Sequence, residues 1–201
     1  MGKLSQFLKK LKKSRHLIRM TIVGDGAVGK TTLVQALIRQ TGKSMHKSNV
    51  SNSLKNKEIT RTPFMEIETW TYDDLLFQCY DLAGQRIPGS HPLDLMRTQV
   101  IKAIDIYIFV FSVDVYKSFE NINNWIELMD LKEQQLNGHT GLVLVGNKID
   151  LERNISDELI KSVVGKDKYF QNYVETCSLD GRGIDILLDE ITNIGKKLLN
   201  N

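Results

Sequence analysis

The chain is poor in the residues on which several protein classes depend. Its 201 residues include only 2 cysteines and 3 prolines. Two cysteines do not form a disulfide framework, and this usage indicates a reducing compartment. The longest apolar run, residues 106–111, is far shorter than the roughly 18 residues that cross a membrane. The ordinary fractions of hydrophobic and charged residues exclude a wholly disordered chain, a collagen and a low-complexity array.

The remaining composition is that of an ordinary globular protein, with 41% hydrophobic and 25% charged residues. The length predicts one domain. The net charge of +3 is unevenly distributed, because residues 1–19 contain 7 basic and no acidic residues, whereas the rest contains 20 basic and 24 acidic ones. We therefore predict a basic arm over 1–16 and a slightly acidic domain over 17–201. A broad basic surface for nucleic acid is not expected.

Strand-like and helix-like segments alternate along the chain. The strand over 64–71 is expected at a sheet edge, joined to its neighbour by an Asp73-Asp74 turn, and residues 41–61 are expected to form a long mobile loop. The alternation predicts an α/β fold with about six strands in a mostly parallel sheet and helices on both faces. Hydrophobic patterning predicts strands over 17–23, 64–71, 75–80, 106–113, 142–145 and 173–177, and helices over 30–39, 119–129, 159–164 and 184–198.

Residues 24–31 match the pattern GxxxxGK[ST] in full. They follow a predicted strand and precede a predicted helix, the context in which this pattern forms the phosphate loop of P-loop NTPases. Backbone N–H groups of the glycine-rich turn would surround phosphate oxygens, Lys30 would reach the β- and γ-phosphates, and Thr31 would bind Mg²⁺. The predicted phosphate-binding residues are Gly24, Asp25, Gly26, Ala27, Val28, Gly29, Lys30, Thr31 and Thr32.

A second motif, Asp81-Leu82-Ala83-Gly84-Gln85, follows the strand predicted over 75–80. An aspartate at the carboxyl end of a strand beside the phosphate loop can hold Mg²⁺, usually through water. The Gly84 N–H can reach a γ-phosphate, and the Gln85 amide can orient an attacking water. We therefore predict Asp81 as a metal-side residue and Gln85, together with Lys30, as catalytic residues.

A third motif, Asn147-Lys148-Ile149-Asp150, follows another buried strand. The Asp150 carboxylate at a purine edge can accept hydrogen bonds from both N1–H and the 2-amino group of guanine. Adenine lacks this donor pair and would leave the charge unpaired, which is costly. Lys148 would lie along the base, and Asn147 would tie neighbouring loops together. The motif predicts guanine specificity.

In this order the three motifs are similar to those of Ras-superfamily small GTPases, over about residues 17–200. The resemblance implies a switch that binds GTP or GDP with Mg²⁺ and hydrolyses GTP slowly. It also implies an exchange factor, a GTPase-activating protein and an effector as partners. The family's switch threonine, which binds Mg²⁺ and senses the γ-phosphate, corresponds best to Thr62, with Thr60 as the alternative, and the resemblance adds Thr62 to the predicted catalytic residues. Phe64, after Pro63, stands where the family often has glycine.

The guanine-facing Ser-Ala-Lys segment of the family corresponds to Cys177-Ser178-Leu179 in this chain. The family contact is made by a backbone N–H, so the resemblance implies that Ser178 can make it. Leu179 replaces the family's lysine. All three residues are included among the nucleotide-binding residues.

The N-terminal arm has an amphipathic pattern. Leu4, Phe7, Leu8 and Leu11 recur at helical spacing, with lysines mainly on the rest of the helical wheel. The pattern resembles the N-terminal helix of Arf-family GTPases and predicts an interfacial helix on an anionic membrane surface. The protein would then be cytoplasmic and peripheral on the cytosolic face of the membrane. The alternatives for the arm are a solvated tail or a helix docked on the folded body. The C-terminus has no cysteine for prenylation, as in Arf proteins, but residues 24–28 are closer to Ras and Rab.

Two other functions compete with the switch. A constitutive nucleotide-binding scaffold that does not cycle is consistent with Phe64, although Gln85 and Thr62 argue against it. A P-loop ATPase or nucleotide kinase is opposed by the guanine motif over 147–150.

Four further residues are interpreted as structural. Trp70 and Trp125 are expected to pack in the core. Cys79 and Cys177 are expected to be inert strand residues.

Overall fold

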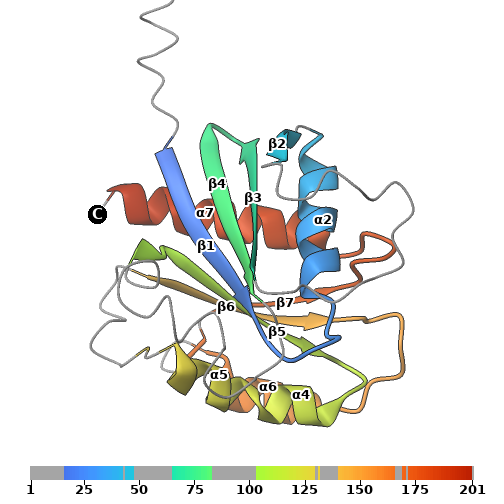
Figure 1. Ribbon diagram of the computed structural model, residues 1–201. Coiled ribbons are helices and arrows are strands. Elements are labelled where there is room, and N and C mark those ends of the chain that lie inside the picture. The colour runs from blue at the N-terminus through green and yellow to red at the C-terminus, as the bar shows by residue number, and fades with distance from the viewer. Residues whose placement is uncertain are drawn as a thin grey trace, which may run out of the picture.

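The computed structural model describes residues 16–42, 44–47, 65–82, 103–129, 131, 140–165, 169–170 and 172–200. Within these ranges seven strands form one sheet (Figure 1), namely β1 (His16–Val23), β2 (Ser44–Lys47), β3 (Met65–Tyr72), β4 (Leu75–Leu82), β5 (Ile106–Ser112), β6 (Gly141–Asn147) and β7 (Asn172–Thr176). The helices are α2 (Lys30–Thr41), α4 (Tyr116–Glu120), α5 (Ile122–Leu128), α6 (Asp157–Val163) and α7 (Ile184–Asn200). Residues 1–15 of the predicted arm lie outside the described residues.

The sheet has the order β2-β3-β4-β1-β5-β6-β7 and is mostly parallel. β1 pairs in parallel with β4 and β5, and parallel pairing continues through β6 to β7. β3 runs antiparallel to both of its neighbours. The predicted α/β fold is confirmed. β1 lies where the strand order reverses, which is the position at which open α/β sheets bind ligands.

The short strand β2 was not expected from the sequence. It pairs antiparallel with β3, so the prediction that the strand over 64–71 lies at the sheet edge is wrong. A strand of four residues is too short to show a hydrophobic period in the sequence. β2 is held in the sheet by backbone hydrogen bonds to β3. Of the loop expected over 41–61, Thr41 completes α2 and 44–47 form β2, while residues 43 and 48–61 lie outside the described ranges.

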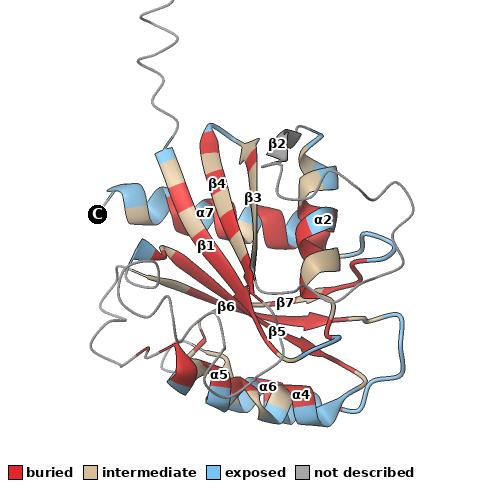
Figure 2. Cartoon of the chain, in the orientation of Figure 1, coloured by how far each residue is buried: buried red, intermediate tan, exposed pale blue. Residues whose placement is uncertain are grey.

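Helices cover both faces of the sheet. α2 and α7 pack on one face, and α4, α5 and α6 lie on the other (Figure 1). Because both faces are covered, all of β5 is buried (Figure 2), and its residues 106–111 form a continuous apolar run. No described helix combines the length and apolarity needed to cross a membrane. Alternate residues of β5 enter the two cores, Ile106, Ile108 and Val110 on the α2–α7 side and Tyr107, Phe109 and Phe111 on the other.

Individual residues at the helix ends determine where the helices begin and end. Gly29, with φ of 94°, precedes α2, and Gly42, with φ of 62°, ends it. The Ser156 side chain caps α6 by accepting a first-turn N–H. The helix predicted over 119–129 is divided at Asn121 into α4 and α5, because the Asn121 backbone ends one helix and begins the next.

The β3–β4 hairpin is tied to α7 at its tip. Asp73 and Asp74 have φ of 47° and 65°, the left-handed geometry of a tight hairpin turn, which confirms the predicted turn. Lys196 of α7 forms an ion pair with Asp73, and the Tyr72 hydroxyl donates to Asp189 Oδ1 at 3.1 Å. The hairpin is therefore fixed to the helix that closes the fold.

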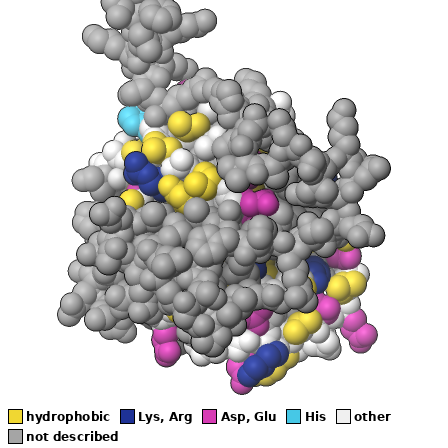
Figure 3. Space-filling view, in the orientation of Figure 1, with side chains coloured by type: hydrophobic (Ala, Val, Ile, Leu, Met, Phe, Trp, Pro, Cys, Tyr) yellow, Lys and Arg dark blue, Asp and Glu magenta, His cyan; other side chains and the backbone are white. Residues whose placement is uncertain are grey.

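Figure 3 shows the side-chain types of the described residues on one face of the molecule. On the face shown in Figure 3, acidic and basic side chains of the described residues are interspersed with apolar ones. This distribution agrees with the nearly balanced charge count of the chain after its basic N-terminus.

Candidate functional site

The polar residues singled out from the sequence meet at one edge of the sheet. Parallel strands end at the same edge, and the register places Ile22 of β1 opposite Asp81 of β4. On the other side of β5, Asn147 of β6 lies opposite Thr176 of β7. The phosphate loop, Asp81, the guanine motif and the segment after β7 are thereby brought together at the carboxyl ends of these strands.

The phosphate loop turns tightly from β1 into α2. Gly24, Ala27 and Gly29 have φ of 147°, 64° and 94°. A side chain at Gly24 would collide with the Val110 carbonyl oxygen, and one at Gly29 with the Asn147 amide, so both positions require glycine. The residue that precedes α2, Gly29, has no side chain with which to cap the helix, and the positive end of the helix dipole lies at the loop. Gly26 and Ala27 are exposed, Val28 is buried and Thr32 is half-buried.

Lys30 is folded back onto the loop. Its Nζ donates to the Gly24 carbonyl at 2.8 Å and to the Asp25 carbonyl at 2.7 Å. Burial lowers the pKa of Lys30 to about 8, although the charges of Asp81 and Asp25 oppose the shift. The ammonium is thus held beside the loop, where it can exchange carbonyl oxygens for phosphate oxygens.

Thr31 and Asp81 form the second polar pair of the site. The Thr31 hydroxyl donates to Asp81 Oδ2 at 2.5 Å. Burial raises the pKa of Asp81 to about 6, while the Thr31 hydrogen bond and the Lys30 charge act in the opposite direction. The other oxygen, Oδ1, is buried without a hydrogen-bond partner in the described part of the chain.

This pair fits a magnesium ion. Mg²⁺ takes oxygen ligands and is usually held by one or two protein groups together with phosphate oxygens and water. A hydroxyl beside a buried carboxylate with one unused oxygen supplies such protein groups. Within the described ranges no three His, Cys, Asp or Glu side chains cluster as a separate metal site.

Asp25 makes contacts that sequence reasoning missed. Its Oδ2 accepts a hydrogen bond from Asn121 Nδ2 at 2.7 Å, and its Oδ1 accepts one from Trp125 Nε1 at 2.8 Å. Trp125 packs in the core as predicted and is 5% exposed, but its indole N–H also joins α5 to the phosphate loop. The partners are about 100 residues apart, and no local pattern indicates such a contact.

The Asn147 amide joins the phosphate loop to the base-side loops. Its Nδ2 donates to the Val28 carbonyl at 2.9 Å. Its Oδ1 accepts from the Thr176 hydroxyl at 3.0 Å and from the Ser178 hydroxyl at 2.8 Å. Asn147 is 1% exposed, so each of these bonds is shielded from water.

The segment after β7 differs from expectation in two respects. Cys177 lies one residue beyond β7, so its interpretation as a strand residue is wrong, and its thiol donates to Asp150 Oδ1 at 3.1 Å. The Ser178 N–H, expected to face guanine, donates to Asn147 Oδ1 at 3.2 Å. Leu179 is 72% exposed.

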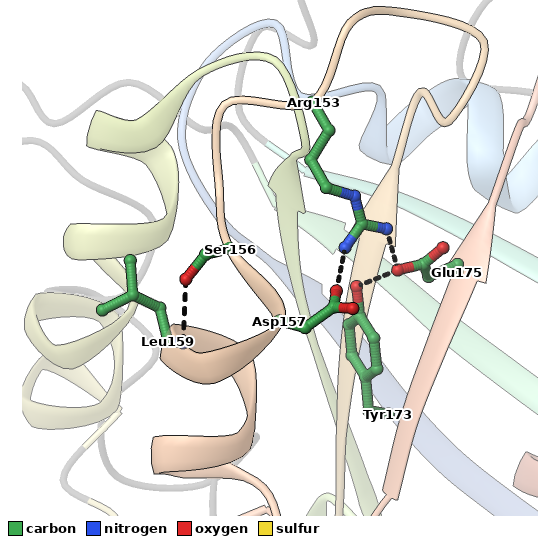
Figure 4. A network of polar contacts seen from close by, with 6 residues as sticks. All are labelled: Arg153, Ser156, Asp157, Leu159, Tyr173 and Glu175. Atoms are coloured by element: carbon green, nitrogen blue, oxygen red, sulfur yellow. Dashed lines mark hydrogen bonds and ion pairs between the residues drawn. The ribbon is translucent and has the colours of Figure 1, made fainter.

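A second contact set steadies the loop after the guanine motif (Figure 4). Arg153 forms ion pairs with Asp157 of α6, at 2.9 Å, and with Glu175 of β7. The Tyr173 hydroxyl donates to the same Glu175 carboxylate at 2.8 Å. The loop leaving Asp150 is therefore tied to the strand that leads into Cys177. These pairs are half-exposed, so each contributes little stability and mainly fixes geometry.

A comparison with known protein families matches residues 19–196 to the Ras family. The chain belongs to the Ras family. It is therefore a small GTPase, and its GxxxxGKT loop and guanine motif lie within the matched residues.

Individual relatives of this GTPase carry Ras-related names. Ras-related protein Rab7 of Prunus armeniaca is 29% identical, over 93% of this chain and 84% of that protein. Ras-related protein RABG3d of Arabidopsis thaliana is 27% identical, over 89% of this chain and 82% of that protein. Ras-related protein Rab-28 of Caenorhabditis elegans is 28% identical, over 82% of this chain and 62% of that protein.

Several expected site residues of this GTPase lie outside the described ranges. They are Thr60, Thr62, Gly84 and Gln85. The described site therefore comprises the phosphate loop, the Thr31–Asp81 pair, the guanine motif and the segment after β7.

Replacing Asn147 with alanine is expected to destabilise the GTPase by about 3 kcal/mol, because several buried polar groups lose their partner. Urea denaturation measures the change in the free energy of unfolding. Asn123→Ala, on the exposed side of α5, is the matched control and should change it by less than about 0.5 kcal/mol. Equal effects of the two variants would contradict the linking role of Asn147.

Proposed function

We propose that this GTPase is a molecular switch that alternates between GTP and GDP forms and acts in membrane traffic or signalling. The observation that carries the proposal is that Asn147, the first residue of the guanine motif, is hydrogen-bonded to the phosphate loop and to the segment after β7. A nucleotide needs its phosphates and its base held in one site, and these bonds join the two sides. The similarity to Ras-related Rab proteins supports the assignment to traffic. The nucleotide domain would span 17–201, with a separate arm over 1–16.

The phosphates would bind between the loop backbone and the N-terminus of α2. Lys30 would give up its two carbonyl partners for β- and γ-phosphate oxygens, and the N–H groups of the loop would face the same oxygens. Thr31 and Asp81 would hold Mg²⁺, with Thr62 joining them in the GTP form. When bound, the ion would neutralise charge on the β- and γ-phosphates.

The base would lie against the guanine motif. Asp150 would accept from guanine N1–H and the 2-amino group, with the Cys177 thiol orienting its carboxylate. Lys148 would cover one face of the base. The segment Cys177-Ser178-Leu179 would close the base site.

Hydrolysis would depend on residues beyond the described ranges. Gln85 would orient the attacking water, and the Gly84 N–H would sense the γ-phosphate. Thr62 and Gly84 would be ordered by GTP and released after hydrolysis, and an effector would read that difference. Turnover would be slow alone, because an arginine supplied by an activating protein adds about 10³–10⁵ in rate.

Asp150→Asn is expected to shift base preference from guanine to xanthine by about a hundredfold or more, because the amide replaces a charged acceptor that two guanine donors require. Competition of GTP, XTP and ATP for the purified protein measures it. Asp185→Asn, an exposed carboxylate in the first turn of α7, is the matched control. Equal binding of ATP and GTP by the native protein would refute guanine reading.

Gln85→Leu is expected to abolish GTP hydrolysis while GTP binding is retained, because leucine cannot orient water. Single-turnover phosphate release measures the first property, and nucleotide retention the second. Gln35→Leu, on the exposed side of α2, should hydrolyse GTP at the native rate. A native protein that binds GTP but never hydrolyses it would favour the non-cycling scaffold.

The N-terminal arm would attach the GTP form to an anionic membrane surface. Burial of each apolar residue of the stripe at 4, 7, 8 and 11 contributes about 1–2 kcal/mol, and each lysine near the surface about 1 kcal/mol. Ordering a short helix and screening by salt oppose these gains. The result would be weak, reversible attachment.

Phe7→Glu, or deletion of residues 2–13, is therefore expected to remove liposome binding without changing nucleotide affinity. Co-sedimentation with anionic liposomes at physiological salt measures it, with the GTP form pelleting more than the GDP form. Ile186→Glu, an exposed apolar residue of α7, is the control outside the arm. Pelleting that survives the deletion would assign the binding to the folded domain.

A further inference from the structure

Asp25, the second residue of the phosphate loop, is held from outside the loop. Each of its carboxylate oxygens accepts one side-chain hydrogen bond, Oδ2 from Asn121 at 2.7 Å and Oδ1 from Trp125 at 2.8 Å. Two bonds to one planar group fix its orientation as well as its position. The carboxylate is therefore directed towards the start and middle of α5.

The same stretch of loop backbone is held at two further points. The Asp25 carbonyl accepts from Lys30 Nζ at 2.7 Å, and Gly24 lies so close to the Val110 carbonyl that no side chain fits between them. The entry to the loop is thus fixed by β5, by Lys30 and by α5. When Lys30 turns to a phosphate, the contacts with β5 and α5 are the ones that remain.

The carboxylate also presents an electrostatic problem that its two partners solve. A negative charge next to a polyphosphate site opposes nucleotide binding. Two N–H donors bound to it compensate the charge locally. Removing either donor would leave one carboxylate oxygen without its partner and the charge less compensated beside the phosphate site.

We propose that Asp25, Asn121 and Trp125 form a positioning element. It holds the backbone of the phosphate loop in the conformation that binds the diphosphate of the nucleotide. The inference rests on the proposed function of the site. All three are positioning residues, because they act through the loop backbone.

The two tryptophans of the chain provide a matched pair of variants. Both are buried, Trp125 at 5% and Trp70 at 0% exposure, and both pack in a core. The Trp70 Nε1 has no hydrogen-bond partner in the described part of the chain, whereas the Trp125 Nε1 bonds to Asp25. A change from tryptophan to phenylalanine keeps an aromatic ring and removes the N–H in each case.

The experiment measures release of a fluorescent GDP from the full-length native protein, Trp125→Phe and Trp70→Phe. We expect release about tenfold faster from Trp125→Phe and within about twofold of native from Trp70→Phe, since only the former loses a bond to a charged acceptor. A tryptophan that only packs would give the two variants the same rate.

A donor–acceptor exchange tests the element independently of ring packing. Asn121→Asp alone places two carboxylates face to face and should accelerate release more than about tenfold. Adding Asp25→Asn supplies an amide that can donate to the new carboxylate through its nitrogen and accept from Trp125 through its oxygen. Release from the double variant should therefore return to within about threefold of native. If Trp125→Phe does not fold, this exchange decides the question by the same readout.

The outcomes separate this inference from the proposed function. A native protein that does not retain GDP refutes the guanine-nucleotide switch. A native protein that retains GDP overturns the positioning element if Trp125→Phe and Trp70→Phe release it alike, or if the exchange does not restore the rate.

Discussion

The arrangement of the site depends on one buried side-chain amide, that of Asn147. Its four hydrogen bonds reach the phosphate loop on one side and Thr176 and Ser178 on the other. All of its partners are shielded from water, so any displacement would leave buried polar groups without partners. This is why Gly29 has no room for a side chain, and why the phosphate side and the base side keep a fixed separation.

The site contains a buried cation, Lys30, and a buried carboxylate, Asp81. These groups suit a polyanionic ligand and a metal ion, respectively. Burial lowers the pKa of Lys30 and raises the pKa of Asp81, and both shifts favour the uncharged side chain. The Thr31 hydroxyl donates to Asp81, and the neighbouring Lys30 ammonium donates to two carbonyls of the loop. Under the proposed function, phosphate oxygens would become the partners of Lys30, and Mg²⁺ the partner of Thr31 and Asp81.

Local sequence was sufficient to predict the parts of the candidate site that are formed by residues adjacent in the chain. The glycines and lysine of the phosphate loop, the aspartate near the end of β4 and the guanine motif that begins with the last residue of β6 are short patterns whose spacing reflects backbone geometry. The apolar run of β5 identified a strand buried on both faces. The parallel sheet then places the ends of these strands together, so the residues forming most of the site could be predicted without knowing their distances.

Which distant groups meet could be learned only from the folded chain. β2 exists because β3 offers a strand to pair with, Cys177 orients Asp150 because β7 ends beside the guanine motif, and Asp25 is held by residues about 100 positions away. A hydrogen bond between side chains far apart in sequence leaves no period or motif in either segment. Periodicity and motifs were therefore enough to predict the fold class and to select the candidate groups of the site, whereas packing determined which of those groups restrain one another.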